Sequence, residues 1–150
     1  MAARHIVCFG NELHGDDGFG IRIYAELCRL TWPKDVEVFN AGIAGLNALR
    51  FLEDCRQAIL VDALANVGKI GEVYLLKAED LAGKHQQATG HGLGIPYLLA
   101  ALKVIREPLP DILIVGAEVA EITPFSAGLS DTTEQAVAKT VQLIRGLLPE

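Results

Sequence analysis

Short apolar runs alternate with segments of helical spacing along most of the chain. The apolar runs predict strands at residues 5–9, 36–39, 58–62, 72–76 and 112–115. Apolar residues three and four positions apart predict helices from Gly18 to the Trp32-Pro33 pair, through Leu46, Leu49 and Leu52, over 95–105 and over 130–148. Strands that alternate with helices indicate an α/β protein with a mostly parallel sheet covered on both faces.

For several of these segments the sequence also predicts a position in the fold, a strand direction or a local structural role. Residues 58–62 are apolar up to the terminal acid, which is typical of a central strand covered on both faces. Residues 72–76 follow after too short a connection for a helical crossover, so we expect that strand to run antiparallel. Residues 77–92 are polar and predict a long loop of the functional kind. Ser130 is the expected N-cap of the last helix.

Composition and charge narrow the class of protein. A length of 150 residues favours one domain, residues 1–150, with a core that needs no disulfide or metal. The 13 basic and 19 acidic residues give a net charge of −6 with no basic stripe, so we expect no nucleic-acid partner. No apolar run approaches the roughly 20 residues of a membrane span, and no signal peptide precedes the first strand. We therefore expect a cytoplasmic protein that does not bind membranes.

Several kinds of chemistry are excluded by missing motifs. Cys8, Cys28 and Cys55 are odd in number and form no C-x-x-C pair, so we expect three reduced thiols packed in the core. The loop after the first strand lacks the glycines of a dinucleotide site, and no Gly-Lys-Ser/Thr sequence marks a phosphate loop. Ser126 and Ser130 are not flanked as the nucleophile of a serine hydrolase. Side chains with oxygen or nitrogen donor atoms, such as those of Asp and His, therefore remain as candidate functional groups.

The candidates follow predicted strands or lie in the long loop. Asp16 and Asp17 follow the first strand, Asp62 ends the third, and His91 stands between two glycines. Loops after parallel strands meet at one edge of the sheet, where the ligands of such proteins bind. Two carboxylates and one imidazole suit a divalent ion such as zinc, nickel, iron or manganese, and leave positions open for a second molecule.

Each candidate also has a purely structural interpretation. Asp16 and Asp17 are placed to cap the first helix. Asp62 is placed to accept hydrogen bonds from amides of its own turn. His91 is suited to a surface position, as are His14 and His85. His14 and His85 are also weaker candidates for a functional site, because neither follows the end of a predicted strand.

The segment 10–22, GNELHGDDGFGIR, closely resembles the opening motif of the nickel-iron hydrogenase maturation proteases, G-N-x-L-x-x-D-[DE]-x-x-G-x-[RP]. The likeness continues at residues 40–45, 60–63, 90–93 and 128–130, and so covers nearly the whole chain. It implies a three-layer α/β/α sandwich around a mostly parallel, twisted five-stranded sheet with one antiparallel strand.

The resemblance also implies an activity and its residues. Members of the family are endopeptidases that remove the C-terminal extension from the nickel-loaded precursor of a hydrogenase large subunit. The metal-contacting positions carry over as Asp17, Asp62 and His91, and the catalytic candidates as Asp16, Asp17 and Asp62. We expect a monomer whose partner is that precursor. Nickel would come with the substrate, and no tightly bound cofactor is expected, although zinc or cadmium fits the same ligands.

Departures from the family pattern bear on the choice of partner. Asn40-Ala41-Gly42-Ile43 replaces the common Asp-Gly-Gly-Thr type of turn, and Val119 stands where many relatives have proline.

Two other functions stay open at this point. One is a metallopeptidase or amidohydrolase that carries its own zinc. The other is a non-catalytic chaperone that binds nickel or the large subunit without cutting.

Overall fold

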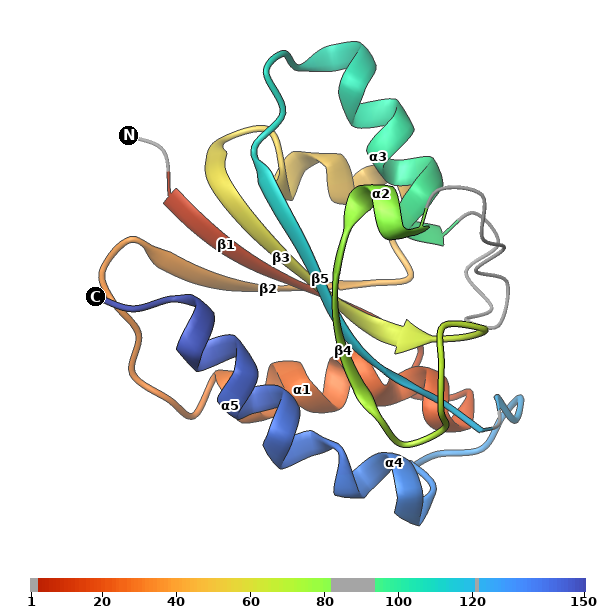
Figure 1. The fold of residues 1–150 in the computed structure, drawn as a ribbon. Coiled ribbons are helices and arrows are strands. Elements are labelled where there is room, and N and C mark those ends of the chain that lie inside the picture. Colours follow the sequence, from red (N-terminus) through yellow and green to blue (C-terminus); the bar gives the residue numbers. More distant parts are fainter. Residues whose placement is uncertain (1–2, 82–93, 121) are drawn as a thin grey trace.

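The computed structural model describes residues 3–81, 94–120 and 122–150, which contain one five-stranded sheet. The strands lie in the order β2-β1-β3-β5-β4 (Figure 1). Their bounds are β1 Ala3–Phe9, β2 Val36–Gly42, β3 Cys55–Leu64, β4 Val73–Lys77 and β5 Asp111–Glu118. All neighbouring pairs are parallel except β4 with β5, which is antiparallel. Both the central place of β3 and the reversed direction of β4 confirm the sequence predictions.

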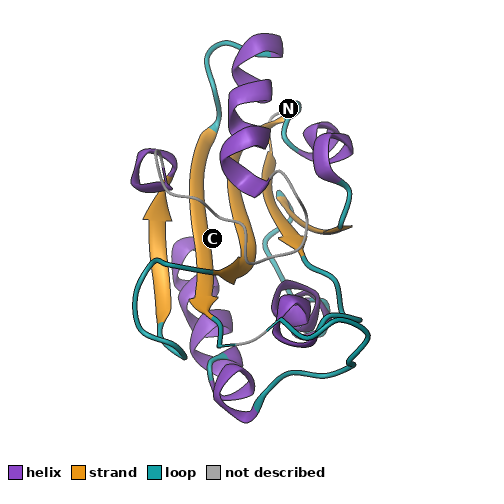
Figure 2. Cartoon of the chain, turned by 90° about the vertical axis from the view of Figure 1, so that its right-hand side faces the viewer, coloured by secondary structure: helices purple, strands orange, loops and turns teal. Residues whose placement is uncertain are grey.

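Helices cover both faces of the sheet. Helices α1 (Phe19–Leu27) and α5 (Val137–Leu147) pack on one face. The 3₁₀ helix η2 (Gly45–Phe51) and helix α3 (Gly94–Ile105) pack on the other (Figure 2). The predicted three-layer α/β/α sandwich is therefore confirmed. In the described parts of the chain, no helix is long and apolar enough to cross a membrane.

The continuous apolar strands are explained by these two cores. In β1, Ile6 and Cys8 belong to the core beneath α1 and α5, whereas Val7 and Phe9 belong to the core beneath η2 and α3. Residues 58–61 of β3 alternate between the two cores in the same way. Burying a large apolar side chain contributes about 1.5–3 kcal/mol, so a strand covered on both faces is stabilised by nearly every residue.

The helical segments differ in detail from the predictions. Residues 45–51 form a 3₁₀ helix instead of an α-helix, and the Leu52 amide bonds the Leu49 carbonyl three residues back. Part of the predicted loop is helical, as α2 (Ala78–Leu81), and residues 82–92 of it lie outside the described residues. The last helix is divided at Ala136 into α4 (Asp131–Gln135) and α5.

The prediction of three core cysteines is wrong for one of them. Cys8 and Cys55 are buried, but Cys28 is exposed. The reason is that α1 buries the face of Phe19, Ile23 and Leu27, whereas Cys28, which keeps helical backbone angles, lies on the neighbouring face with the half-buried Tyr24 and the exposed Ala25.

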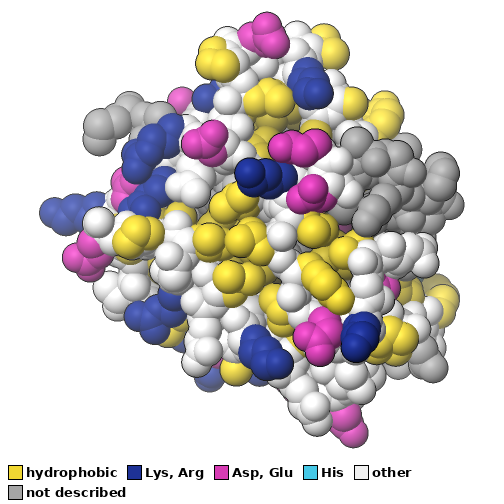
Figure 3. Space-filling model, viewed as in Figure 1, with side chains coloured by type: hydrophobic (Ala, Val, Ile, Leu, Met, Phe, Trp, Pro, Cys, Tyr) yellow, Lys and Arg dark blue, Asp and Glu magenta, His cyan; other side chains and the backbone are white. Residues whose placement is uncertain are grey.

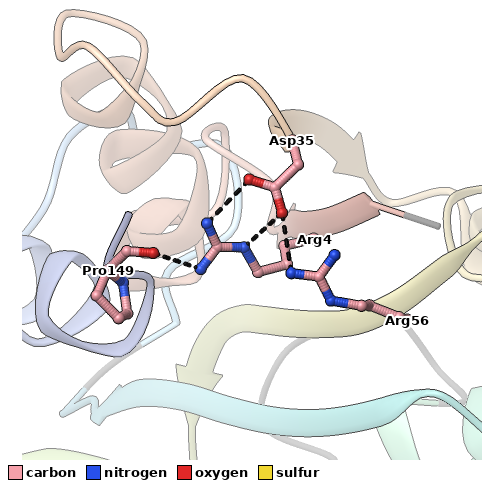
Figure 4. A network of polar contacts seen from close by, with 4 residues as sticks. All are labelled: Arg4, Asp35, Arg56 and Pro149. Carbon is pink, nitrogen blue, oxygen red and sulfur yellow. Dashed lines mark hydrogen bonds and ion pairs between the residues drawn. The ribbon is translucent and has the colours of Figure 1, made fainter. Parts of the chain in front are cut away.

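The amino-terminal edge of the sheet is held by a network of charged side chains (Figure 4). The Arg4 guanidinium donates to both carboxylate oxygens of Asp35, at 2.8 and 2.9 Å, and to the carbonyl of Pro149 at 2.8 Å. Arg56 adds a contact of 3.1 Å to Asp35. The network joins the starts of β1, β2 and β3 to the end of the chain. It lies at the opposite end of the parallel strands from the predicted site.

Candidate active site

The three predicted acids are buried at the carboxyl-terminal edge of the sheet. Asp16 and Asp17 lie in the 3₁₀ helix η1 (Gly15–Gly18), between β1 and α1, and Asp62 lies near the end of β3. Their exposed fractions are 2%, 0% and 3%. Burying an ionised carboxylate is unfavourable unless hydrogen-bond donors or a cation meet it, so the contacts of each acid indicate its role.

The Asp17 turn is fastened to the end of β1. The Asn11 amide donates to the Asp17 carbonyl at 3.1 Å and to its carboxylate at 3.2 Å. A Cβ at Gly10 would collide with the Asp17 carbonyl, and one at Gly20 would collide with the Phe9 carbonyl, so these glycines permit the close approach. Because η1 also contacts β3, the segment of Asp17 lies next to the strand of Asp62.

Asp16 connects this turn to the start of α4. The Ser130 amide donates to one Asp16 carboxylate oxygen at 2.7 Å, and the Ser130 hydroxyl donates to the other at 2.8 Å. Ser130 is also the N-cap of α4, as predicted, and accepts from the Thr133 amide at 3.4 Å. By contrast, the N-cap of α1 is Gly18, with no side-chain cap. Asp16 therefore holds two distant segments together and does not cap α1.

Asp62 lies in the wall of a small pocket. Its carboxylate accepts from the Ala63 amide at 2.8 Å, and because β3 continues to Leu64 this contact lies within the strand and not in a turn. The pocket has a volume of about 20 Å³, and the other described residues that line it are uncharged, namely Phe9, Gly42, Ile43, Gly45, Gly94, Ile95 and Leu98. A space of this size holds about one water molecule. Ile43, which lines the same pocket, is 64% exposed, whereas Asp62 itself is buried.

The thiol of Cys8, in β1, is buried. Burial raises the pKa of Cys8, and the neighbouring Cys28 and Asp62 raise it further. A thiol with a raised pKa stays protonated near neutral pH and is a poor nucleophile. Cys8 therefore acts as a core residue, as expected.

The predicted metal ligands are only partly within the described structure. Asp17 and Asp62 come from neighbouring segments, whereas His91 lies outside the described residues, as does His85. Among the residues that are described, no group of three or more His, Cys, Asp or Glu is arranged to hold a metal ion. The set of Asp17, Asp62 and His91 therefore stays a prediction.

A carboxylate that was not among the predicted candidates supports the loop after β3. The Glu118 carboxylate accepts from the amides of Asn66, Val67 and Gly68 at 2.9, 2.8 and 3.0 Å. Glu118 ends β5 as Asp62 nearly ends β3, so an acid after a buried apolar strand was the available signal. Its three donors indicate a structural role in holding residues 66–68.

A larger groove lies away from these acids. Its volume is about 840 Å³, and it is lined by α3, the end of β4 and the start of β5. Both charge signs are represented in the lining, by Lys77, Glu79, Lys103 and Asp111. In Figure 3, acidic and basic side chains lie close together on the upper part of this face. The groove contains none of the three predicted acids, so the candidate active site remains at the carboxyl-terminal edge.

Buried acids at the carboxyl-terminal edge of an α/β sandwich define an enzyme-like site. Residues 21–146 match the model of the family described as hydrogenase maturation protease. The chain belongs to that family and is a peptidase.

Individual relatives agree with this assignment. A protein of Methanocaldococcus jannaschii, named for the same family, is 32% identical over 146 residues, covering 94% of this chain and 93% of that protein. The hydrogenase 3 maturation protease of Escherichia coli is 26% identical to this chain. The alignment covers 94% of this chain and 88% of that protein.

Solved structures share the fold. The hydrogenase maturating endopeptidase HybD of Escherichia coli superposes with a TM-score of 0.83 at 23% identity, covering 97% of this chain and 91% of that one. The hydrogenase 2 maturation peptidase of a Thaumarchaeota archaeon gives a TM-score of 0.68 at 29% identity, with 95% of each chain covered. The α/β/α architecture is thus that of known maturation peptidases.

Proposed function

We propose that this peptidase removes the C-terminal extension from the nickel-loaded precursor of a hydrogenase large subunit. The observation that supports this most strongly is the pair of buried acids, Asp17 and Asp62, on neighbouring segments of one sheet edge in a member of the maturation protease family. A buried carboxylate pair favours a cation as its ligand. The names of the relatives point to hydrogenase as the source of the substrate.

In this proposal the nickel ion belongs to the substrate and serves as the recognition element. Asp17, Asp62 and His91 would bind it, since carboxylate oxygen and imidazole nitrogen are suitable ligands for nickel. Only a precursor that has received nickel would then be held with its scissile peptide at the site. The position of Asp62 in the wall of a small pocket supports this role.

Hydrolysis needs a group that takes a proton from the attacking water. The water oxygen bonds to the peptide carbonyl carbon, its proton goes to a carboxylate, and the proton is then delivered to the leaving amine as the C–N bond breaks. Both Asp16 oxygens accept from Ser130, which favours a positioning role for Asp16. We therefore assign proton transfer to Asp17. Nickel would polarise the peptide carbonyl while it is bound.

The test is incubation of nickel-loaded precursor with the protein, followed by mass spectrometry of the precursor. We expect loss of the C-terminal extension with the wild type, and a rate lower by about 100-fold or more with Asp62→Asn or Asp17→Asn. The amide side chain introduced by Asp62→Asn retains an oxygen that accepts from Ala63, so the fold should persist. Asp111→Asn, an exposed acid at the other end of the strands, is the matched control and should cleave normally.

Two results would contradict the proposal. A precursor of unchanged mass, bound to the wild type under conditions where nickel is loaded, would indicate a chaperone that does not cut. Cleavage by Asp62→Asn at the wild-type rate would remove Asp62 from the site.

A further inference from the structure

Three of the exposed apolar side chains at the same edge as the buried acids lie in loops next to them. Leu13 follows β1, Ile43 follows β2 and Phe125 follows β5, with exposed fractions of 58%, 64% and 90%. Because these strands are parallel, the loops that follow them share one edge. We call Leu13, Ile43 and Phe125 the apolar rim. Exposed apolar side chains that gather around a polar centre are typical of an interaction surface.

Phe125 is held outward by its neighbours. Its φ of +57° lies in the left-handed region, which is unfavourable for a bulky aromatic residue and persists only where surrounding contacts impose it. Two backbone bonds supply such contacts: the Ser126 amide donates to the Leu13 carbonyl at 2.8 Å, and the Gly15 amide donates to the Ser126 carbonyl at 2.7 Å. The Phe125 ring also meets the His14 ring edge to face, with centroids 5.9 Å apart.

The same segment is fastened a second time, to the acids. Ser126 is bonded to residues 13–15 and Ser130 to Asp16, so residues 126–130 are held at both ends by the turn that carries Asp16 and Asp17. Figure 1 shows this blue segment beside the turn between β1 and α1. Leu13 and Phe125 therefore keep a fixed position relative to the acidic turn.

Ile43 has a corresponding place beside Asp62. It lines the Asp62 pocket, and its loop is joined to the end of β1 by a bond of 3.0 Å from the Gly10 amide to the Gly42 carbonyl. The rim thus has one part beside Asp17 and another beside Asp62. Both parts of the rim therefore lie near the proposed active site.

We propose that the apolar rim binds an apolar segment of the large-subunit precursor next to the peptide bond that is cut, an inference that rests on the proposed function. Charge complementarity selects this occupant. The buried acids attract a cation, and exposed apolar side chains lie at the same edge, so the site fits a metal-bearing segment flanked by apolar residues. A second copy of this chain, with its net charge of −6, would bring like charge to the acids.

The test is cleavage kinetics of Phe125→Asn on nickel-loaded precursor. Asparagine tolerates the left-handed conformation, so this change removes the apolar ring without adding backbone strain. We expect the KM for the precursor to rise about tenfold with kcat within about twofold of the wild type, because an aromatic contact at an interface contributes mainly to binding. Leu13→Asn gives an independent test and should raise KM in the same direction.

Val104→Asn is the matched control. Val104 is 84% exposed and lies nine residues beyond Ile95 in α3, roughly 13 Å along the helix axis from the Asp62 pocket. This variant should keep the wild-type KM and kcat. An equal rise in KM for Val104→Asn would contradict a specific role of the rim.

The outcomes separate this inference from the proposed function. If the wild type cleaves the precursor and neither rim variant changes KM, the rim proposal is wrong and the proposed function stands. If the wild type neither binds nor cleaves the nickel-loaded precursor, both are wrong. If Phe125→Asn converts a dimer to a monomer in sedimentation measurements while KM is unchanged, the rim is an interface between copies and the proposal is overturned.

Discussion

Adjacent acids in the same turn have different contacts. Asp16 accepts from the amide and the hydroxyl of Ser130, 114 residues away in the sequence. Asp17 accepts from the amide of Asn11, only six residues away. The difference supports separate roles, with Asp16 positioning two segments and Asp17 taking part in the chemistry. The sequence motif alone does not show which of the two acids has which role, because Asp16 and Ser130 come into contact only when the chain is folded.

The three cysteines should differ in reactivity. Burial raises the pKa of Cys8 and of Cys55, whereas Cys28 is exposed at the end of α1. We expect iodoacetamide at pH 8 to label the native protein at Cys28 alone and the unfolded protein at all three thiols. Mass spectrometry of intact protein and peptides measures the labels. Rapid labelling of Cys8 in the native protein would contradict the burial and pKa described for it.

At the scale of elements, Ser130 couples α4 to the acidic turn. Ser130→Ala removes the hydroxyl contact with Asp16 and the N-cap contact with Thr133, while the amide at position 130 still donates to Asp16. We expect the free energy of unfolding to fall by about 1–2 kcal/mol, measured by urea denaturation. Ser126→Ala is the control, since the described bonds of Ser126 are made by its backbone. Equal stability of the two variants would contradict the coupling.

Periodicity predicted the strands well and the kind of helix less well. Residues 58–62 form part of the central strand because both of their faces are buried, as their continuous apolar character indicates. Leu46, Leu49 and Leu52 are three residues apart, which is one turn of a 3₁₀ helix, so their spacing also suits the helix observed. Ala136 keeps helical backbone angles where α4 ends and α5 begins, so no breaker residue marks that boundary.

The place of the candidate site was predictable, but its supporting contacts were not. Asp16 and Asp17 follow β1 and Asp62 lies near the end of β3, and the parallel topology alone brings them to one edge. The bonds that hold the edge join residues far apart, such as Glu118 with the amides of residues 66–68. Pairings across 50 or more residues depend on tertiary packing, which local patterns do not contain.

For the whole molecule, the two ends of the parallel strands have different tasks. The amino-terminal edge carries the ion-pair network of Arg4, Asp35 and Arg56, which joins three strands and the end of the chain. The carboxyl-terminal edge carries the buried acids and the apolar rim. This separation permits a variant in the network to alter stability while the active site stays intact.

The network predicts a pH-dependent contribution to stability. The hydrogen bond from Arg4 lowers the pKa of Asp35, so ionised Asp35 stabilises the fold above the ordinary pKa of an aspartate, about 3.9. That contribution is lost as the pH falls through the lowered pKa. We expect Asp35→Asn to have a lower Tm than the wild type at pH 7, with the difference shrinking below about pH 4.

Calorimetry across this pH range measures the effect. Asp54→Asn, an exposed acid just before β3, is the control and should keep the wild-type Tm at pH 7. A Tm difference for Asp35→Asn that stays constant from about pH 7 to about pH 3 would contradict the stabilising role of the ionised carboxylate.

The central claim is that the protein cleaves the precursor only when the precursor carries nickel. In the most direct measurement, the metal content of the purified wild-type protein is determined first. The protein is then incubated separately with nickel-loaded and with nickel-free precursor, and the mass of each precursor is measured by mass spectrometry. We predict that only the nickel-loaded precursor loses its C-terminal extension, and that the purified protein holds no stoichiometric metal. Cleavage of nickel-free precursor at the same rate, by protein that carries one zinc per chain, would contradict this claim.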